Sequence, residues 1–204
     1  MSHDNDPAIP DDLNECVKFH GHLCPGLVYG YRVAKEALRL LDNGKADDEE
    51  IVVVSENDSC AVDGFQKILG TTAGKGNLIV RDYGKNVYTV FSRKARRAVR
   101  FSRIFEYRYQ GEHPDAFDVL EKAVSDKTAT PAEMKRQKYL KSMDLATKQF
   151  NEIFNTSEVN YEEIPYAPLA PSKACVTCGE LIMKTKMVDD GNGGFQCIPC
   201  STKI

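Results

Sequence analysis

The sequence lacks the features that would place the chain in a membrane or on nucleic acid. No apolar run reaches the length of a membrane span, and the first ten residues are polar and acidic, unlike a signal peptide. The net charge of −3 argues against general binding to polyanions. The chain also has no internal repeat and no low-complexity tract. We therefore expect a soluble, cytoplasmic protein with no membrane partner.

What is present is the composition of a soluble globular protein, with 42% apolar and 28% charged residues. The 204 residues suffice for one domain of ordinary size with a small appendage. Seven cysteines is an odd number, and four of them form C-x-x-C pairs. This usage indicates thiolates that hold metal in a reducing compartment, because a disulfide framework would call for paired cysteines.

The segment Phe19–Gly26 concentrates metal-ligating and nucleophilic side chains. It contains two of the four histidines and one of the seven cysteines within five residues. In an extended segment, residues two apart point to the same side, so His20, His22 and Cys24 would face one point. They would form a metal site, or an activated thiol beside two bases. The alternative is a turn that happens to hold histidines.

Helical periodicity and end signals predict helices over Asp11–His20 and about Pro25–Leu41, with Cys24 at or near the N-cap of the second helix. The β-branched run Ile51–Val54 predicts a strand buried on both faces. Further expected elements are a helix capped by Asp58 or Ser59 that stops at Gly70, strands at Leu78–Asp82 and Asn86–Phe91 in a hairpin, a helix from Pro114, and a long helix capped by Thr130 whose apolar positions continue to Ile153.

Cys60 follows the buried strand and lies in the first turn of the next helix, as Cys24 does in its own helix. A helix N-terminus stabilises a thiolate and lowers the pKa of the thiol. If the two helix starts converge, Cys60 and the His-Cys segment surround one pocket with the character of a catalytic zinc site. Cys60 is equally well explained as a packed core cysteine.

Asp58 and Asp63 flank Cys60, and either carboxylate could orient a histidine or act as a base, although helix capping explains both as well. The candidate catalytic residues are Cys60, Cys24, His22 and Asp63. The candidate ligands of a core metal, expected to be zinc, are His20, His22, Cys24 and Cys60.

The C-terminal cysteines give the strongest signal. Cys175 and Cys178 form one C-x-x-C turn, and Cys197 and Cys200 form a second after eighteen intervening residues. Two such turns complete a tetrahedral site, so we predict a structural zinc that supplies the folding energy of a segment too short for a core. An iron–sulfur cluster is the main alternative for four thiolates.

Two other stretches have weaker functional interpretations. The glycine-rich turn Gly74–Asn77 lacks the spacing of a phosphate-binding loop, and we expect a tight turn near the pocket. Arg93–Arg108 is the one concentrated basic stretch. It permits a nucleic-acid interpretation, but its charges share no clean face, and we expect solvated structure with its aromatic side chains packed.

The expected architecture is an α+β core with a mixed or antiparallel sheet and packed helices, followed by a small zinc finger. We place the core at residues 1–156 and the finger at residues 174–204. Residues 157–173 hold three prolines and are typical of an extended linker.

Three motifs together resemble the FmdE family of formylmethanofuran dehydrogenase proteins: Phe19–Gly26 (FHGHLCPG), Asp58–Asp63 (DSCAVD) and Thr72–Leu78 (TAGKGNL). The tail that begins with Cys175–Glu180 resembles the treble-clef zinc finger appended to many members. The resemblance implies an α+β core with a groove that holds His20, His22, Cys24 and Cys60, a metal in or near it, Asp63 nearby, and a homodimer.

The family name also comes from methanogenesis, in which a molybdenum or tungsten enzyme transfers CO2 to methanofuran. The resemblance thus implies an accessory or catalytic role in one-carbon or molybdenum/tungsten enzyme metabolism, with other subunits of such an enzyme as partners. The alternative is a regulatory module in which the zinc finger and residues 93–108 bind nucleic acid or a protein. Lys184 and Lys186 of the finger are offset by nearby acidic residues, so nucleic acid is the less favoured partner.

Overall fold

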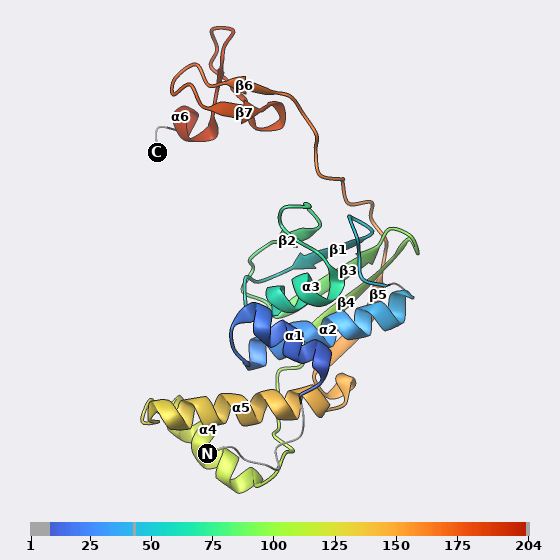
Figure 1. Ribbon diagram of the computed structural model, residues 1–204, viewed down its shortest axis with the longest axis vertical. Helices are drawn as coiled ribbons and strands as arrows, with labels where there is room; N and C mark the ends of the chain where they lie inside the picture. Colours follow the sequence, from blue (N-terminus) through green and yellow to red (C-terminus); the bar gives the residue numbers. More distant parts are fainter. Residues whose placement is uncertain (1–8, 43, 203–204) are drawn as a thin grey trace. The chain divides into compact units, whose positions relative to one another are not determined.

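The computed structural model describes residues 9–42 and 44–202, which divide into two compact units at the Ile164–Pro165 bond. Each unit is described by itself (Figure 1). The first unit contains α1 (Asp11–His20), α2 (Pro25–Leu41), β1 (Ile51–Ser55), α3 (Ala61–Leu69), β2 (Leu78–Val80), β3 (Val87–Ser92), β4 (Arg97–Arg103), α4 (Pro114–Ser125), α5 (Pro131–Thr147), the 3-10 turn η1 (Phe150–Glu152) and β5 (Phe154–Val159). The second unit contains β6 (Ser172–Ala174), β7 (Leu181–Met183), the 3-10 turn η2 (Lys184–Lys186), β8 (Val188–Asp189), β9 (Phe195–Gln196) and α6 (Ile198–Thr202).

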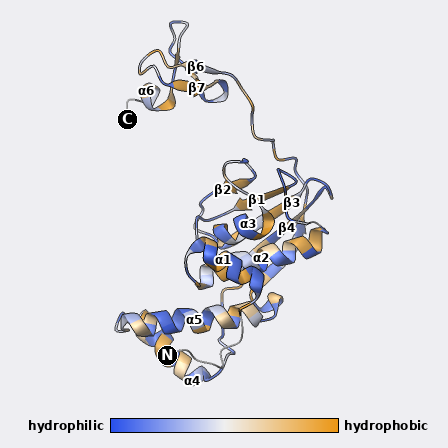
Figure 2. Ribbon diagram, viewed as in Figure 1, coloured by the Kyte–Doolittle hydropathy of each residue, from blue (hydrophilic) through white to orange (hydrophobic). Residues whose placement is uncertain are grey.

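The sheet of the first unit has the strand order β2-β1-β3-β4-β5 among the described residues. β1 pairs in parallel with β2, and the other neighbours are antiparallel. β1 is buried along its whole length, as its β-branched run predicts, and Figure 2 shows its apolar character beside the largely hydrophilic α5. The predicted α+β class with a mixed sheet is confirmed.

The predicted hairpin of β2 and β3 is wrong. β1 lies between them, so that Val53 pairs with Leu78 on one side and with Val90 on the other. The connection returns past the end of β1, where the carbonyl of Glu56 accepts hydrogen bonds from the N–H groups of Tyr83 and Lys85. The most apolar strand takes the central position because there it is covered on both sides and both faces.

The chain beyond α5 also differs from the prediction. The helix ends at Thr147, and η1 and β5 follow instead of further helical turns. Phe150 and Phe154 stack on each other in the core, with ring centroids 5.5 Å apart, so an apolar spacing of four continues without a helix. β5 pairs with β4 as far as Val159, and the sheet therefore extends past residue 156, where we predicted the end of the core.

α2 and α3 pack on each other at unusually short range, and α2 buries most of one face. A Cβ added at Gly30 would lie 2.0 Å from the carbonyl oxygen of Ala61. A Cβ added at Gly64 would lie 2.6 Å from the nitrogen of Tyr31. Glycine at these two positions lets the helix backbones touch, which explains a residue that otherwise disfavours a helix interior.

We expect Gly30→Ala to destabilise the protein by about 3 kcal/mol, the upper end of overpacking costs, because the added methyl meets backbone that cannot move aside. Helix propensity alone would favour alanine by about 1 kcal/mol, so the sign of the change decides between the two effects. Denaturant unfolding measures it. Gly44→Ala is the matched control, since a Cβ there meets nothing within 4 Å and should change stability by less than about 0.5 kcal/mol. Equal effects at both positions would contradict the contact.

Candidate metal centre

The turn between α1 and α2 positions the first candidate site. α1 ends at His20, and Gly21 follows in the left-handed conformation with φ 95°, its N–H bonded to the carbonyl of Val17. Pro25 opens α2, and Cys24 stands at the N-cap, where its Sγ accepts the N–H of Leu27 at 3.4 Å. The helix ends and the N-cap position of Cys24 agree with the sequence prediction.

His20, His22 and Cys24 converge. Their ligand atoms all lie within 4.8 Å of one another. Nε2 of His20 is 3.7 Å from Sγ of Cys24, and the two imidazole rings are 4.6 Å apart. The cause differs from the one predicted: His20 belongs to the last turn of α1, so the chain reversal after it, rather than an extended strand, brings the three side chains together.

Asp63 in the first turn of α3 fixes the orientation of His20. Its Oδ2 lies 2.6 Å from Nδ1 of His20, and its Oδ1 accepts a hydrogen bond from Nε2 of Gln66 at 2.9 Å. A carboxylate next to Nδ1 favours the proton on that nitrogen, which leaves the lone pair of Nε2 directed toward Cys24. Of the roles predicted for Asp63, the geometry matches the orientation of a histidine.

Cys60 lies beside this group at the N-cap of α3, a position that we predicted for Asp58 or Ser59. A Cβ added at Gly26, in the first turn of α2, would lie 3.0 Å from Cβ and 3.6 Å from Sγ of Cys60. The two helix starts therefore meet, as predicted. Cys60 is half-buried and stands outside the set of three ligands that lie within 4.8 Å of one another.

The pKa of Cys24 is perturbed in the direction opposite to the one predicted. Burial raises the pKa of the Cys24 thiol, and the neighbouring Cys60 adds to the increase, while the N–H of Leu27 opposes it. Desolvation of a thiolate thus outweighs the helix N-terminus. In the absence of a metal, this sulfur is held as a thiol.

Asn57 is a site residue that the sequence analysis missed. It is buried, and its Oδ1 accepts hydrogen bonds from the N–H and the hydroxyl of Ser59 at 3.2 and 2.7 Å. Its amide nitrogen donates to the carbonyl of Lys85 at 2.7 Å. Asn57 thereby fixes the turn that delivers Cys60. An asparagine between a strand and a helix is the one available signal, and it is a weak one.

The glycine-rich turn lies away from the candidate site, contrary to our expectation. Asn77 donates to the carbonyls of Asp48 and Ile51, so the loop is anchored at the amino end of β1, whereas Cys60 follows the carboxyl end. Lys75 contacts the carbonyl of Asp47 in the same region. The loop closes the start of the strand, which explains its side chains without a ligand.

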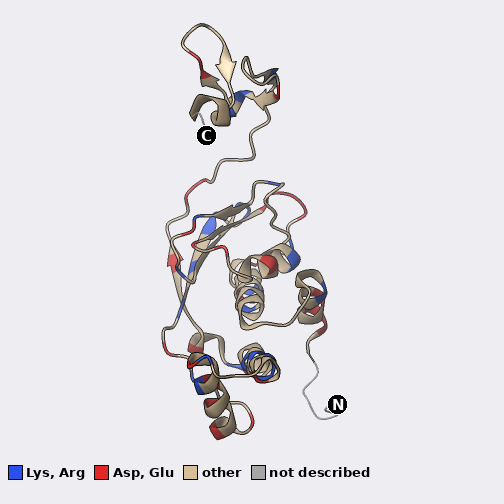
Figure 3. Cartoon of the chain, turned by 90° about the vertical axis from the view of Figure 1, so that its left-hand side faces the viewer, with Lys and Arg blue, Asp and Glu red and all other residues tan. Residues whose placement is uncertain are grey.

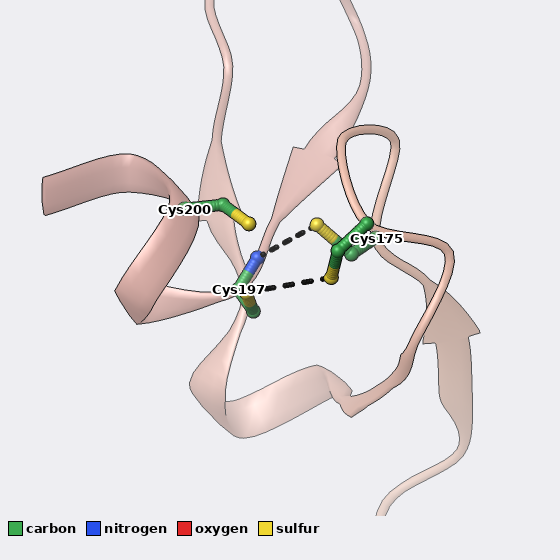
Figure 4. A group of neighbouring side chains, drawn as sticks. Cys175, Cys197 and Cys200 are labelled. Atoms are coloured by element: carbon green, nitrogen blue, oxygen red, sulfur yellow. Dashed lines mark hydrogen bonds between the residues drawn. The ribbon is translucent and has the colours of Figure 1, made fainter. Parts of the chain in front are cut away.

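The four tail cysteines form the second cluster, with all sulfur atoms within 4.8 Å of one another. Figure 4 shows how Cys175, Cys197 and Cys200 gather there. Gly179, with φ 78°, closes the first knuckle, and α6 carries Cys200. β8 and β9 pair as predicted. The tail is a small four-cysteine knuckle of the kind expected from the sequence.

The protonation of the tail thiols favours a cation. Hydrogen bonds from the N–H groups of Cys178 and Cys197 lower the pKa of Cys175 to about 6. The neighbouring thiol of Cys197 raises the pKa of Cys200 to about 12. The cluster thus readily releases a first proton and resists losing the last one, because the thiolates repel each other. A divalent metal removes that repulsion and accepts all four sulfurs.

A cavity of about 310 Å³ lies between α4 and α5, away from both clusters. Aromatic and apolar side chains such as Tyr109, Phe117 and Met143 dominate its lining, and none of the candidate site residues belongs to it. The cavity therefore has no part in the His-Cys chemistry.

The basic stretch forms β4 and its flanks, and its arginines are paired within the protein. Figure 3 shows acidic and basic residues interspersed over this unit. The guanidinium of Arg96 also lies 5.1 Å from the ring centroid of Tyr161. The ion pairs are Arg93–Glu163, Arg96–Glu163, Arg97–Glu158, Arg100–Glu56 and Arg108–Glu106.

Within residues 9–42 and 44–202, no helix combines the length and the apolarity that crossing a membrane requires.

Comparison with known proteins gives three findings. Residues 19–160 match the family described as "FmdE, Molybdenum formylmethanofuran dehydrogenase operon". The chain is 30% identical over 182 residues to a protein of Archaeoglobus fulgidus named "Probable S-adenosyl-L-methionine-binding protein"; the match covers 84% of this chain but 49% of that protein, so the chain spans about half of its relative. A solved FmdE-like protein of tungsten formylmethanofuran dehydrogenase, from Syntrophus aciditrophicus, shares the fold, with a TM-score of 0.59 and 19% identity over 94% of this chain and 90% of that one. The match over residues 19–160 contains His20, His22, Cys24, Cys60 and Asp63, and the chain therefore belongs to the FmdE family.

Proposed function

We propose that the chain is a zinc protein with a catalytic-type site in the core and a structural site in the tail. The observation that carries the proposal is the convergence of His20, His22 and Cys24 within 4.8 Å. Ligands about 2.0–2.3 Å from zinc stand about 3.3–3.8 Å apart in a tetrahedron, so small side-chain movements complete the geometry. Mixed imidazole and thiolate ligands suit zinc among the common cations.

The two sites differ in the number of protein ligands. The tail offers four thiolates and closes the coordination sphere, which is typical of a structural site. The core offers two imidazoles and one thiolate, with Cys60 beside them. A zinc ion held by three protein ligands supplies a Lewis acid and lowers the pKa of a bound water to about 7. In this proposal Asp63 positions His20, and Cys60 borders the fourth position.

The names of the relatives suggest the area of metabolism. The family description concerns a formylmethanofuran dehydrogenase operon, and the half-matched relative is named for binding S-adenosyl-L-methionine. Formyl and methyl carriers both belong to one-carbon chemistry. We propose an accessory or catalytic role there, with subunits of a molybdenum or tungsten enzyme as partners. The homodimer implied by the family resemblance remains a prediction, which solution mass by light scattering tests.

Metal analysis of purified full-length variants tests the two-site proposal. We expect two zinc equivalents in the wild type and one in Cys24→Ser, because the core set loses its thiolate. Cys175→Ser should lose the tail zinc and retain the core zinc. Cys16→Ser is the control, since Cys16 is buried beyond both clusters and should leave both equivalents in place. Two equivalents in folded Cys24→Ser would contradict the core site.

Removal of the Asp63 carboxylate should weaken zinc binding in the core by about 10–100-fold, the usual effect of losing a group that orients a metal-bound histidine. Asp63→Ala leaves His20 free to rotate and to change tautomer. Competition with a chromophoric chelator measures the affinity. Asp58→Ala is the matched control, because Asp58 is an exposed carboxylate five residues away and should bind zinc like the wild type. An unchanged affinity in Asp63→Ala would refute the positioning role.

The nucleic-acid alternative has less support, because the arginines of β4 and its flanks are engaged with carboxylates of the same chain. We expect no binding of duplex DNA or RNA tighter than about 10⁻⁶ M at 150 mM salt, as measured by fluorescence anisotropy. Tighter binding with a steep salt dependence, lost when Arg96, Arg97 and Arg100 are changed to glutamine, would favour the alternative.

A further inference from the structure

Cys24 and Cys60 are held against the same turn of α2. Cys24 lies at the N-cap, with its sulfur over the N–H of Leu27. Cys60 reaches the same turn from α3, where a Cβ added at Gly26 would be 3.6 Å from its Sγ and 3.9 Å from its Cα. Gly26 is two residues from Cys24, so the two thiols belong to one small region although they are 36 positions apart in sequence.

The backbone beneath these thiols has little freedom to separate them. The contacts of Gly30 with the carbonyl of Ala61, and of Gly64 with the nitrogen of Tyr31, hold the first turns of α2 and α3 together. A disulfide requires two Cα atoms about 4.4–6.8 Å apart, and it forms readily where the native backbone already keeps two cysteines adjacent. The tail cysteines belong to the other compact unit.

We propose that Cys60 and Cys24 form a reversible disulfide by exchange with a small-molecule disulfide such as oxidised glutathione, and that this disulfide and the core metal exclude each other. The disulfide itself depends only on the placement of the two cysteines. The exclusion of metal rests on the function proposed above.

The order of the two steps follows from exposure. Cys60 is half-buried and within reach of a small molecule, whereas Cys24 is 7% exposed. The Cys60 thiolate attacks one sulfur of oxidised glutathione, forms a mixed disulfide and releases one glutathione thiolate. The Cys24 thiolate then attacks Sγ of Cys60 and releases the second. Two protein thiols are oxidised, one glutathione disulfide is reduced to two thiols, and both protons pass to the released glutathione.

The metal and the disulfide compete for the same sulfur. A disulfide sulfur no longer offers a thiolate, so His20 and His22 alone would remain as ligands in the core set. Two neutral imidazoles hold zinc far more weakly than a set that includes a thiolate. Oxidation therefore empties the core, and a dithiol reductant restores the site. Such transient disulfides are the usual kind in a reducing compartment.

Peptide mapping of the full-length protein tests the disulfide directly. The zinc-loaded chain is treated with oxidised glutathione, quenched with iodoacetamide and digested with trypsin without reduction. Cleavage after lysine and arginine places Cys24 in residues 19–32 and Cys60 in residues 46–67, each as a single cysteine. The tail cysteines fall in residues 174–184 and 187–203, and Cys16 falls in residues 1–18. Each linkage therefore has its own mass.

We expect a linked species of residues 19–32 and 46–67, together with loss of one of two zinc equivalents, and reversal of both by dithiothreitol with added zinc. Cys60→Ser should retain its core zinc under the same treatment, with release at least tenfold slower than in the wild type. Cys16→Ser is the matched control and should behave like the wild type, because its thiol is fully buried elsewhere.

The outcomes separate this inference from the proposed function. Core zinc that binds in the reduced protein, with no linked species at any glutathione concentration, overturns the disulfide. A linked species in a protein that never binds core zinc supports the disulfide and contradicts the proposed function. Linkage without zinc release overturns the mutual exclusion. If a serine variant fails to fold, the mapping of wild-type protein still decides.

Discussion

The contact between α2 and α3 is the constraint on which the candidate site depends. At Gly30 and Gly64 the two helix backbones approach to distances that no side chain permits. This approach brings the N-cap cysteines of both helices to one place and puts Asp63 in reach of His20. The site is therefore a product of backbone packing, and its side chains are oriented before any metal arrives. Two glycines that cost helix stability locally are retained by a benefit that arises between helices.

The two clusters obtain their shape in different ways. In the described part of the tail unit, Cys175 and Ile182 are the buried apolar side chains, which is too little for a core. Metal coordination must then supply most of the folding free energy, on the order of 10–16 kcal/mol for zinc. The core cluster stands on helices packed against a buried sheet, so its geometry does not require the ion. A tail metal is thus tied to folding, whereas a core metal can exchange while the fold persists.

The sequence predicted what local signals control. Pro25 and the N-cap position of Cys24, the glycine that ends α1, and the capping box at Thr130 are all determined by neighbouring residues, and the structure has them as expected. The convergence of His20, His22 and Cys24 was predicted as well, but from an extended geometry that the chain does not adopt.

The errors concern pairings between distant segments. β1 separates β2 from β3, and only the burial of the whole sheet decides that order. The spacing of Phe150 and Phe154 fits a helix, yet the two rings stack at the junction of η1 and β5 because β4 offers a partner strand. The pKa of Cys24 was misjudged for the same reason, since the sequence shows the helix start but not the burial that overrides it.

These differences indicate where function resides in the molecule. A raised pKa keeps Cys24 protonated in the free site, so a metal must displace a proton, whereas a disulfide with Cys60 removes the same sulfur by oxidation. Metal, proton and disulfide then compete for one atom whose position the helices fix. The tail cannot undergo comparable exchange without losing its fold, because its sulfurs are also its structural support. A site that survives without its ion and responds to both pH and redox state is suited to chemistry, and the core His-Cys group is that site.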